Sequence, residues 1–193
     1  MIKTLLFLSF SILGLCFLSC KKENRKILKP ENITVDENLS KNDTFKILSK
    51  YPELKLFNSE KVESATRTAY ILQISSFSDG YYHTRSVSFE DYKCKTEYKG
   101  DTINIWLNNY NGYFGNGVLI KVFNDQFLIQ DINPKTLKGE IKFINSYPVY
   151  QKLVLNKYPF QKNDSIYGFI DYETKLDSLV TKNFRGHFRT KIK

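Results

Sequence analysis

From Ala69 onward, the chain consists of short runs in which apolar and polar residues alternate. In the first run, Tyr70, Leu72 and Ile74 share one face, and the turn-forming pair Asp79-Gly80 follows them. A period of two is typical of a strand with one buried face, because successive side chains point to opposite sides. About ten such runs, with turn signals at close spacing, predict an all-β domain: an antiparallel β-sandwich or a meander barrel.

Two short segments within this pattern are expected to be hairpin turns. Lys99-Gly100-Asp101 separates two alternating runs, and Asn124-Asp125 separates two apolar runs with residues that tolerate a positive φ. The run Val118–Phe123 is apolar on both faces, which predicts a central strand. Later strands are expected near residues 140–145, 149–155, 165–172 and 184–192.

Helical patterns are short and lie at the edges of this region. Thr44–Lys50 is expected to form a short helix, with Asn42 or Asp43 as its N-terminal cap and Pro52 beyond its end. Asp177–Lys182 indicates one further helical turn between the last two strands.

The first nineteen residues have the pattern of a secretory signal. Lys3 supplies a positive charge, and an apolar run from Leu5 to Leu18 follows it. This run is too short to span a hydrocarbon core of about 30 Å stably. It ends at Ser19-Cys20, a small residue before a cysteine, and Lys21 comes next.

This ending resembles a bacterial lipobox. The resemblance implies that residues 1–19 are a signal peptide and that Cys20 is acylated, becomes the mature N-terminus and anchors the chain in a membrane. Residues 20–43 are polar and charged without sustained periodicity, which predicts the lipidated cysteine followed by a flexible tether. Residues 44–193 are then expected to form a single β domain.

The region around Gly168 carries a second resemblance. A turn, Lys162-Asn163-Asp164, precedes the glycine-interrupted strand Ser165–Tyr172, and this arrangement resembles the C-terminal part of many small sandwich-type lipoproteins of the Bacteroidota. The resemblance implies a bacterial envelope protein, lipid-anchored at the outer membrane, and no particular activity. Interior glycines such as Gly168 and Gly186 indicate a bulge or the close approach of another backbone.

Net charge and cysteine content narrow the classes of partner and site. The formal net charge of +9 suits nucleic acid, anionic lipid or an acidic partner, but an exported lipoprotein does not meet chromosomal DNA. The chain has three cysteines. Loss of Cys16 with the signal and acylation of Cys20 leave Cys94 alone, which excludes an intramolecular disulfide or a Cys-based zinc site in the mature chain. Cys94 lies in an alternating run that turns its thiol inward.

No motif in the chain predicts catalysis. His83 and His187 are far apart, no HExxH or GxSxG motif occurs, and no calcium-loop spacing is present. The adjacent pair Glu90-Asp91 would point to opposite faces of a strand. We therefore expect no catalytic residue, metal or cofactor. The alternative is an envelope hydrolase whose site is assembled from distant strands.

Two segments carry candidate binding residues. In the last strand, Arg185, His187, Arg189 and Lys191 share one face, a stripe suited to anionic headgroups, phosphate-bearing saccharides or an acidic partner. A solvated face or a guarded strand edge would show the same pattern.

The second segment is an aromatic one. In Asn108–Phe114, Tyr110, Tyr113 and Phe114 stand among amide side chains, a mixture used in protein and glycan recognition. The alternative is that these rings close one end of the core. The sequence as a whole predicts a membrane-anchored, non-enzymatic binding module for a protein or glycan, with a toxin-neutralising immunity protein as one subclass.

Overall fold

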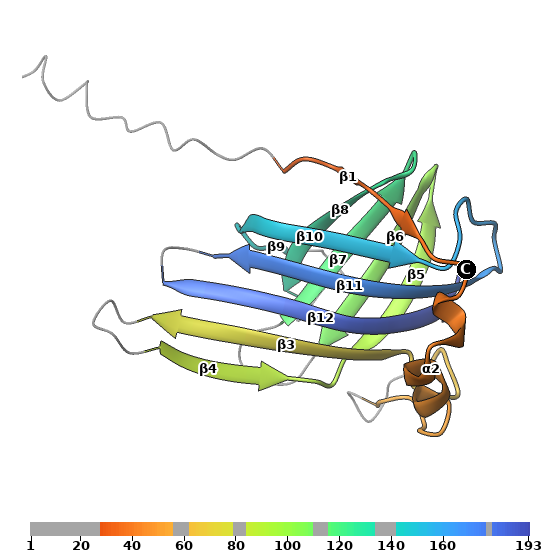
Figure 1. The fold of residues 1–193 in the computed structure, drawn as a ribbon, viewed down its shortest axis with the longest axis horizontal. Helices are drawn as coiled ribbons and strands as arrows, with labels where there is room; N and C mark the ends of the chain where they lie inside the picture. Colours follow the sequence, from red (N-terminus) through yellow and green to blue (C-terminus); the bar gives the residue numbers. More distant parts are fainter. Residues whose placement is uncertain (1–27, 56–61, 79–83, 110–115, 134–141, 177–178) are drawn as a thin grey trace, which may run out of the picture.

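The computed structural model describes residues 28–55, 62–78, 84–109, 116–133, 142–176 and 179–193. They form two β-sheets packed as a sandwich (Figure 1). This confirms the all-β sandwich prediction and decides against a closed barrel. In Figure 1, the strands of the front sheet run nearly horizontally, and those of the rear sheet cross behind them at a steep incline.

The rear sheet, sheet A, is built on a meander of four long strands. Its order is β1-β8-β7-β6-β5, and β9 also pairs with β8. The members of sheet A are β1 (Glu31–Asn32), β5 (Lys93–Lys99), β6 (Thr102–Asn109), β7 (Asn116–Phe123), β8 (Gln126–Asn133) and β9 (Lys142–Phe143). The apolar run at 118–123 therefore lies in the central strand, β7, as predicted.

The front sheet, sheet B, combines the end of the chain with the first long strands. Its order is β2-β10-β11-β12-β3-β4, and only β2 runs parallel to its neighbour. The members of sheet B are β2 (Thr34–Val35), β3 (Ala69–Ser78), β4 (Thr84–Phe89), β10 (Tyr147–Leu155), β11 (Ser165–Lys175) and β12 (Val180–Lys191).

Both predicted hairpins are confirmed by their backbone angles. Lys99 pairs with Thr102 across a turn in which Gly100 has φ +63°. Asn124 and Asp125 connect β7 to β8 with φ values of 47° and 60°, the left-handed conformation that a tight hairpin of this kind requires.

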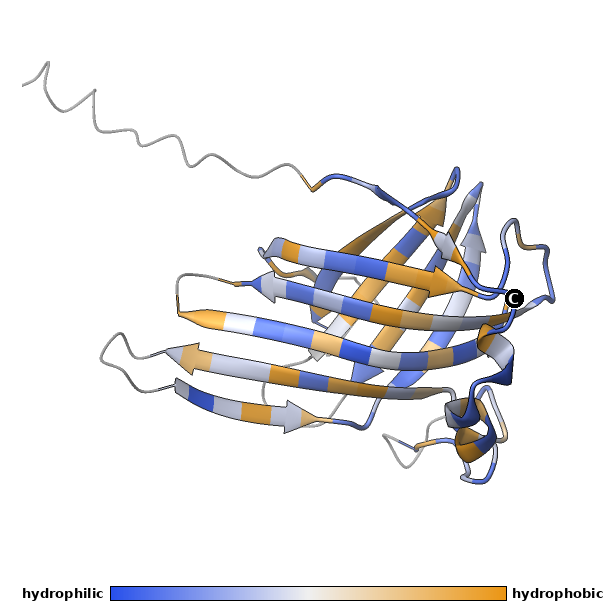
Figure 2. Cartoon of the chain, in the orientation of Figure 1, coloured by the Kyte–Doolittle hydropathy of each residue, from blue (hydrophilic) through white to orange (hydrophobic). Residues whose placement is uncertain are grey.

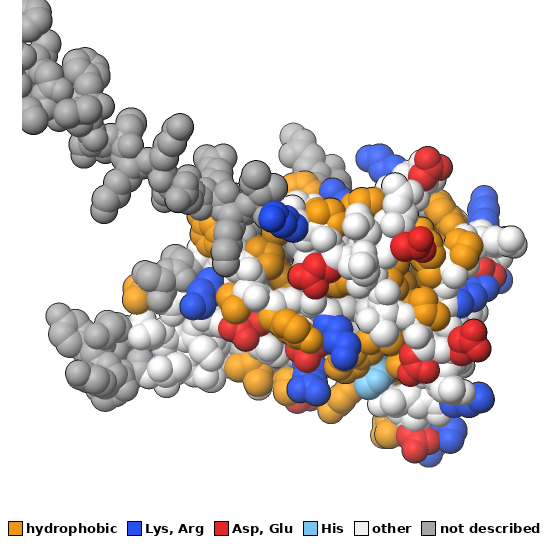
Figure 3. Space-filling view, turned by 45° about the horizontal axis from the view of Figure 1, so that its top comes forward, with side chains coloured by type: hydrophobic (Ala, Val, Ile, Leu, Met, Phe, Trp, Pro, Cys, Tyr) orange, Lys and Arg blue, Asp and Glu red, His pale blue; other side chains and the backbone are white. Residues whose placement is uncertain are grey.

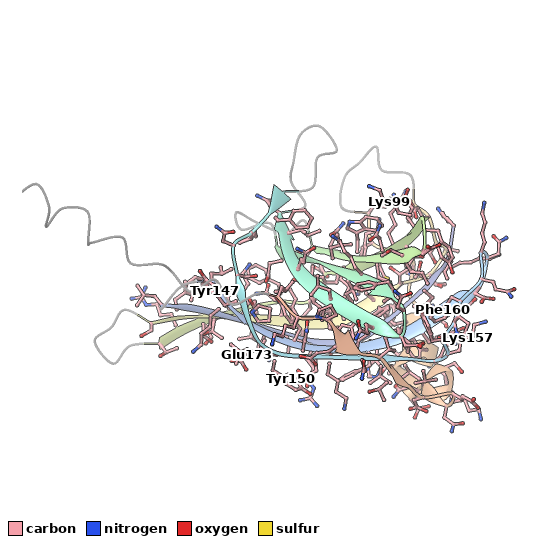
Figure 4. The ribbon with its side chains drawn as sticks, turned by 90° about the horizontal axis from the view of Figure 1, so that it is seen from above. Lys99, Tyr147, Tyr150, Lys157, Phe160 and Glu173 are labelled. Carbon is pink, nitrogen blue, oxygen red and sulfur yellow. The ribbon has the colours of Figure 1, made fainter. Side chains whose placement is uncertain are left out.

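Alternating side chains of both sheets meet in one core. Figure 2 shows apolar and polar bands alternating along the strands of sheet B. Phe184, Phe188 and Ile192 are fully buried on the inner face of the last strand region, as predicted. Figure 4 shows the sheets as two layers, with Tyr150 and Glu173, which pair across β10 and β11, on the outer side of sheet B.

In β3, the apolar face seen in the sequence is the outer one. Tyr70 is 52% exposed, whereas its neighbours Ala69 and Ile71 are fully buried in the core. The same inner face also carries Gln73 and Ser75, whose side chains bond to each other at 2.5 Å. The core thus takes the smaller and more polar face of this strand, beside the buried rings of Phe184 and Phe188 on the neighbouring strand β12 of the same sheet.

One of the two helical predictions is confirmed, and the folded region begins earlier in the chain than predicted. Helix α2 (Asp43–Leu48) forms where expected, and the Asn42 side chain accepts a hydrogen bond from the Thr44 amide at 2.9 Å. The expected helical turn at 177–182 is wrong in its described part, since β12 begins at Val180, and residues 177–178 lie outside the described ranges. Residues 31–41, placed in the tether by the sequence, belong to the fold: they form β1, β2 and the short 3₁₀ helix η2 (Leu39–Lys41).

Among the residues that the structure describes, no helix has the length and apolar character needed to cross a bilayer.

Candidate ligand-binding pocket

A pocket of about 230 Å³ lies at the end of the sandwich where α2 and the C-terminus are found. Its walls come from the irregular segment 62–68, from the start of β11, from the end of β12 and from Cys94 of β5. At this corner the two sheets are joined, because the Thr96 hydroxyl of β5 donates to the Lys191 carbonyl of β12 at 3.0 Å. The pocket is therefore set into a fixed junction between the sheets.

Strand register explains which side chains reach the pocket. Across β11 and β12, Ser165 pairs with Lys191 and Tyr167 pairs with Arg189. The aliphatic hydroxyl groups in the lining are those of Ser64, Thr66, Thr68, Ser165 and Thr190. A lining rich in hydroxyl and cationic groups can hydrogen-bond the oxygen atoms of a polar ligand.

Arg189 holds the wall of the pocket together. Its guanidinium donates to the Arg67 and Phe45 carbonyls at 3.1 and 3.3 Å, to the Ser49 hydroxyl at 2.7 Å and to the Thr66 hydroxyl at 2.8 Å. These bonds join β12 to α2 and to the segment 66–67. No carboxylate of the described residues lies within ion-pair distance of this guanidinium, so its charge contributes to the positive potential of the pocket.

Glu63 carries the one carboxylate side chain among the described lining residues. One carboxylate oxygen is 2.9 Å from the Lys193 ammonium, and the other is 3.6 Å from that of Lys95. Partial burial acts to raise the Glu63 pKa, but the hydrogen bonds and charges of Lys193 and Lys95 outweigh it and lower the pKa. Glu63 is therefore ionised at neutral pH.

Cys94 forms part of the floor. Its side chain is 6% exposed, and its amide donates to the Thr68 hydroxyl at 2.9 Å. Burial, together with the charge of Glu53, raises the pKa of the thiol well above its ordinary range. The inward orientation predicted for Cys94 is confirmed, and the protonated thiol is a poor nucleophile.

The predicted stripe on β12 is divided by the fold. Arg189 and Lys191 line the pocket, whereas Arg185 lies outside it, with its Nε 3.9 Å from an Asp171 carboxylate oxygen. His187 packs against the rings of Phe45 and Phe169 at centroid distances of 5.6 and 5.0 Å. On the face shown in Figure 3, basic, acidic and apolar side chains are interspersed, which does not favour one continuous basic surface.

The remaining predicted site residues lie outside the described ranges. These are Cys20 and the aromatic residues Tyr110, Tyr113 and Phe114.

Sequence reasoning missed the part of the pocket contributed by residues 63–68. This segment has no regular period, and its side chains reach the pocket only because Arg189 and strand β5 hold it. Lys193 was also missed, although it continues the two-residue spacing of Arg189 and Lys191 and could have been found by extending that pattern.

A second group of polar side chains lies inside the sandwich, toward the opposite end of β12. The Asp131 carboxylate accepts hydrogen bonds from the Tyr172 hydroxyl at 2.8 Å and from the Ser146 hydroxyl at 2.6 Å. Lys182, 5% exposed, belongs to the same layer. Burial lowers the Lys182 pKa, and the charge of Asp131 acts in the opposite direction. Because Asp131 is on β8 and Tyr172 is on β11, this layer ties sheet A to sheet B.

Within the described ranges, no group of three or more His, Cys, Asp or Glu side chains is placed to hold a metal ion. No family model, curated protein or solved structure matches the chain. Function must therefore be inferred from the geometry of the pocket.

Proposed function

We propose that the chain is a lipid-anchored lipoprotein of the bacterial envelope that acts as a non-enzymatic binding module. Its ligand, a glycan or a protein side chain, is held in the pocket beside the C-terminus. The observation that carries this proposal is the lining itself: hydroxyl groups and the cations Arg189, Lys191 and Lys193 surround a single carboxylate.

The same lining argues against the alternative, a hydrolase. Paired-carboxylate glycoside hydrolysis requires two acidic side chains that face the substrate from opposite sides. The described lining contains only Glu63, and its lowered pKa leaves no proton for a general acid to donate at neutral pH. His187 is packed between aromatic rings and is not part of the lining, so the pocket hydroxyls have no histidine base there.

The short connection to the proposed anchor suits a ligand near the membrane. Residues 31–35 already pair with β8 and β10, so only residues 21–30 separate Cys20 from the folded domain. Ten residues span about 35 Å when fully extended. An acyl chain on Cys20 would therefore keep the pocket close to the membrane surface and to envelope glycans.

A pocket-filling substitution tests this proposal. Ser165 is exposed at the pocket wall, and Ser165→Trp adds an indole ring there. Ser88→Trp is the matched control, because Ser88 is an exposed serine of β4 outside the pocket. Binding of the two variants and of the wild type would be compared on purified envelope glycans and on cross-linked envelope proteins.

We expect Ser165→Trp to abolish capture of the ligand and Ser88→Trp to retain it. Equal capture by both variants would show that the pocket is not the binding site. Turnover of an envelope glycan by the wild type, lost in Ser165→Trp, would favour the hydrolase instead.

A further inference from the structure

The charge of the pocket restricts the chemistry of its ligand. Among the side chains of the described lining, Arg189, Lys191 and Lys193 are opposed by Glu63, so these side chains carry two more positive than negative charges. A phosphate monoester carries a charge of about −1.5 to −2 at pH 7, which would balance this excess, whereas a carboxylate would balance only half of it.

The donors of the lining also suit a tetrahedral oxyanion. Lys191 is exposed and makes no ion pair in the described part of the chain. The Thr68 hydroxyl accepts a hydrogen bond from the Cys94 amide, which leaves its own proton to donate. Ammonium and hydroxyl donors from different walls can bond different oxygens of one phosphate group, and bonds to a charged acceptor are the stronger kind.

The size of the pocket sets the scale of the ligand. Pockets for drug-sized ligands measure about 300–1,000 Å³. At about 230 Å³, this pocket suits a smaller molecule or one terminal group of a larger one. The Tyr167 ring, held edge-on against Phe45 at a centroid distance of 5.0 Å, offers an apolar wall beside the cations.

Resting on the proposed binding function, we infer that the pocket binds a phosphate monoester group and that Glu63 is the internal counter-ion that this group replaces. In the free protein, Lys193 is paired with Glu63 at 2.9 Å. When a phosphate enters, Lys193 turns to it, and Glu63 keeps Lys95 as its partner. After the exchange, Glu63 is still paired with Lys95, and the phosphate faces Arg189, Lys191 and Lys193. In the free protein, the salt bridge to Glu63 holds Lys193 in place.

Titration calorimetry on the full-length chain in detergent, at low ionic strength, tests this inference. The probes are inorganic phosphate, glucose 6-phosphate and glucose. The variants are Glu63→Gln, Lys191→Gln and Lys193→Gln. Arg185→Gln is the matched control, since it removes the same charge from the same strand as Lys191→Gln but lies outside the pocket.

We expect both phosphates to bind and glucose not to bind. Lys191→Gln and Lys193→Gln should each weaken the binding of phosphate by about two- to fivefold, the range for an exposed charge pair. Glu63→Gln should strengthen binding by a similar factor, because the competing carboxylate is gone. Arg185→Gln should leave affinity unchanged, since four strand residues place it about 13 Å from position 189, beyond the screening length of about 8 Å.

The arms of the experiment separate the sources of the phosphate. Tighter binding of glucose 6-phosphate than of inorganic phosphate supports an esterified ligand. Equal or weaker binding would identify the free anion and overturn the monoester assignment. Binding of glucose as tight as that of its phosphate, no effect of Glu63→Gln, or equal weakening by Arg185→Gln would each overturn the inference. An uncharged ligand whose capture is lost in Ser165→Trp would overturn it while leaving the proposed function intact.

Discussion

At position 187, a histidine occupies a place between two aromatic rings on the outer face of sheet B. Burial lowers its pKa, and the cations Arg185 and Arg189 flank it on the same face of β12. The folded state thus favours the neutral ring, while in the unfolded chain the imidazole takes up a proton with the ordinary pKa of 6.5. The contribution of His187 to the unfolding free energy should be fully present above pH 6.5. It should fall as the pH decreases toward the lowered pKa of the folded state.

The variant His187→Gln tests whether His187 causes a loss of stability on acidification. Urea unfolding at pH 7.5 and at pH 5.5 should show a loss of stability in the wild type on acidification and a smaller loss in the variant. If the wild type and His187→Gln lose the same amount, other groups cause the pH dependence and His187 is protonated equally in both states.

Cys94 gives a second prediction at this scale. In a chain with Cys16 and Cys20 replaced by Ser, Cys94 is the only thiol. Because it is buried and its pKa is raised, it should react slowly with a thiol reagent in buffer and rapidly after urea is added. The rate of colour release from a disulfide reagent measures this, and rapid labelling of the folded chain would contradict the burial of the thiol.

At the scale of elements, the contact between β12 and β3 depends on a glycine. A Cβ added at Gly186 would lie 2.1 Å from the Tyr70 carbonyl oxygen and 2.8 Å from the Ile71 Cα, and Gly186 has φ +155°. Gly186→Ala should therefore force the two strands apart and lower the unfolding free energy by roughly 3 kcal/mol.

Gly100→Ala is the matched control for this change. Gly100 also has a positive φ, +63°, but a Cβ there would meet no atom within 4 Å. Gly100→Ala should lower the unfolding free energy by about 1–2 kcal/mol, from the unfavourable backbone conformation alone. Chemical denaturation of both variants measures the difference; similar costs would mean that β3 yields easily and that the close approach is not tightly fixed.

The strands that the sequence predicted are those with a long alternating pattern. Cys94 in β5 and Phe184 in β12 were placed on the correct faces because a period of two identifies the buried side directly. The two-residue strands β1 and β2 have no such pattern, and they form because the edges of β8 and β10 offer unpaired backbone groups. Their positions depend on tertiary structure, which local sequence does not contain.

At the scale of the whole molecule, the pocket is the feature that local sequence could not predict. Two of its cations, Arg189 and Lys191, were found from strand spacing, but Glu63 lies in a segment without a pattern. The wall exists because Arg189 bonds residues more than a hundred positions earlier, such as Ser49 at 2.7 Å. Contacts of this kind require the finished fold, in which the first and last parts of the domain lie side by side.

The same arrangement bonds the N-terminal segment of the described domain to both sheets. β1 pairs with β8 of sheet A and β2 pairs with β10 of sheet B, so the chain leaves the sandwich from a segment that is bonded to both layers. Both layers therefore fix the start of the folded domain, which residues 21–30 separate from Cys20.

The last prediction concerns that tether. Each methylene of an acyl chain buried in the bilayer contributes about 0.8 kcal/mol, so several chains on Cys20 would hold the protein at the membrane permanently. Cys20→Ala should leave an unprocessed or soluble protein when cells are fractionated and the mass of the chain is measured. Cys16→Ala is the control, because Leu15 before it is not a small residue and the variant should be processed normally. A Cys20→Ala chain that still reaches mature mass and stays with the membranes would rule out acylation at this cysteine as the anchor.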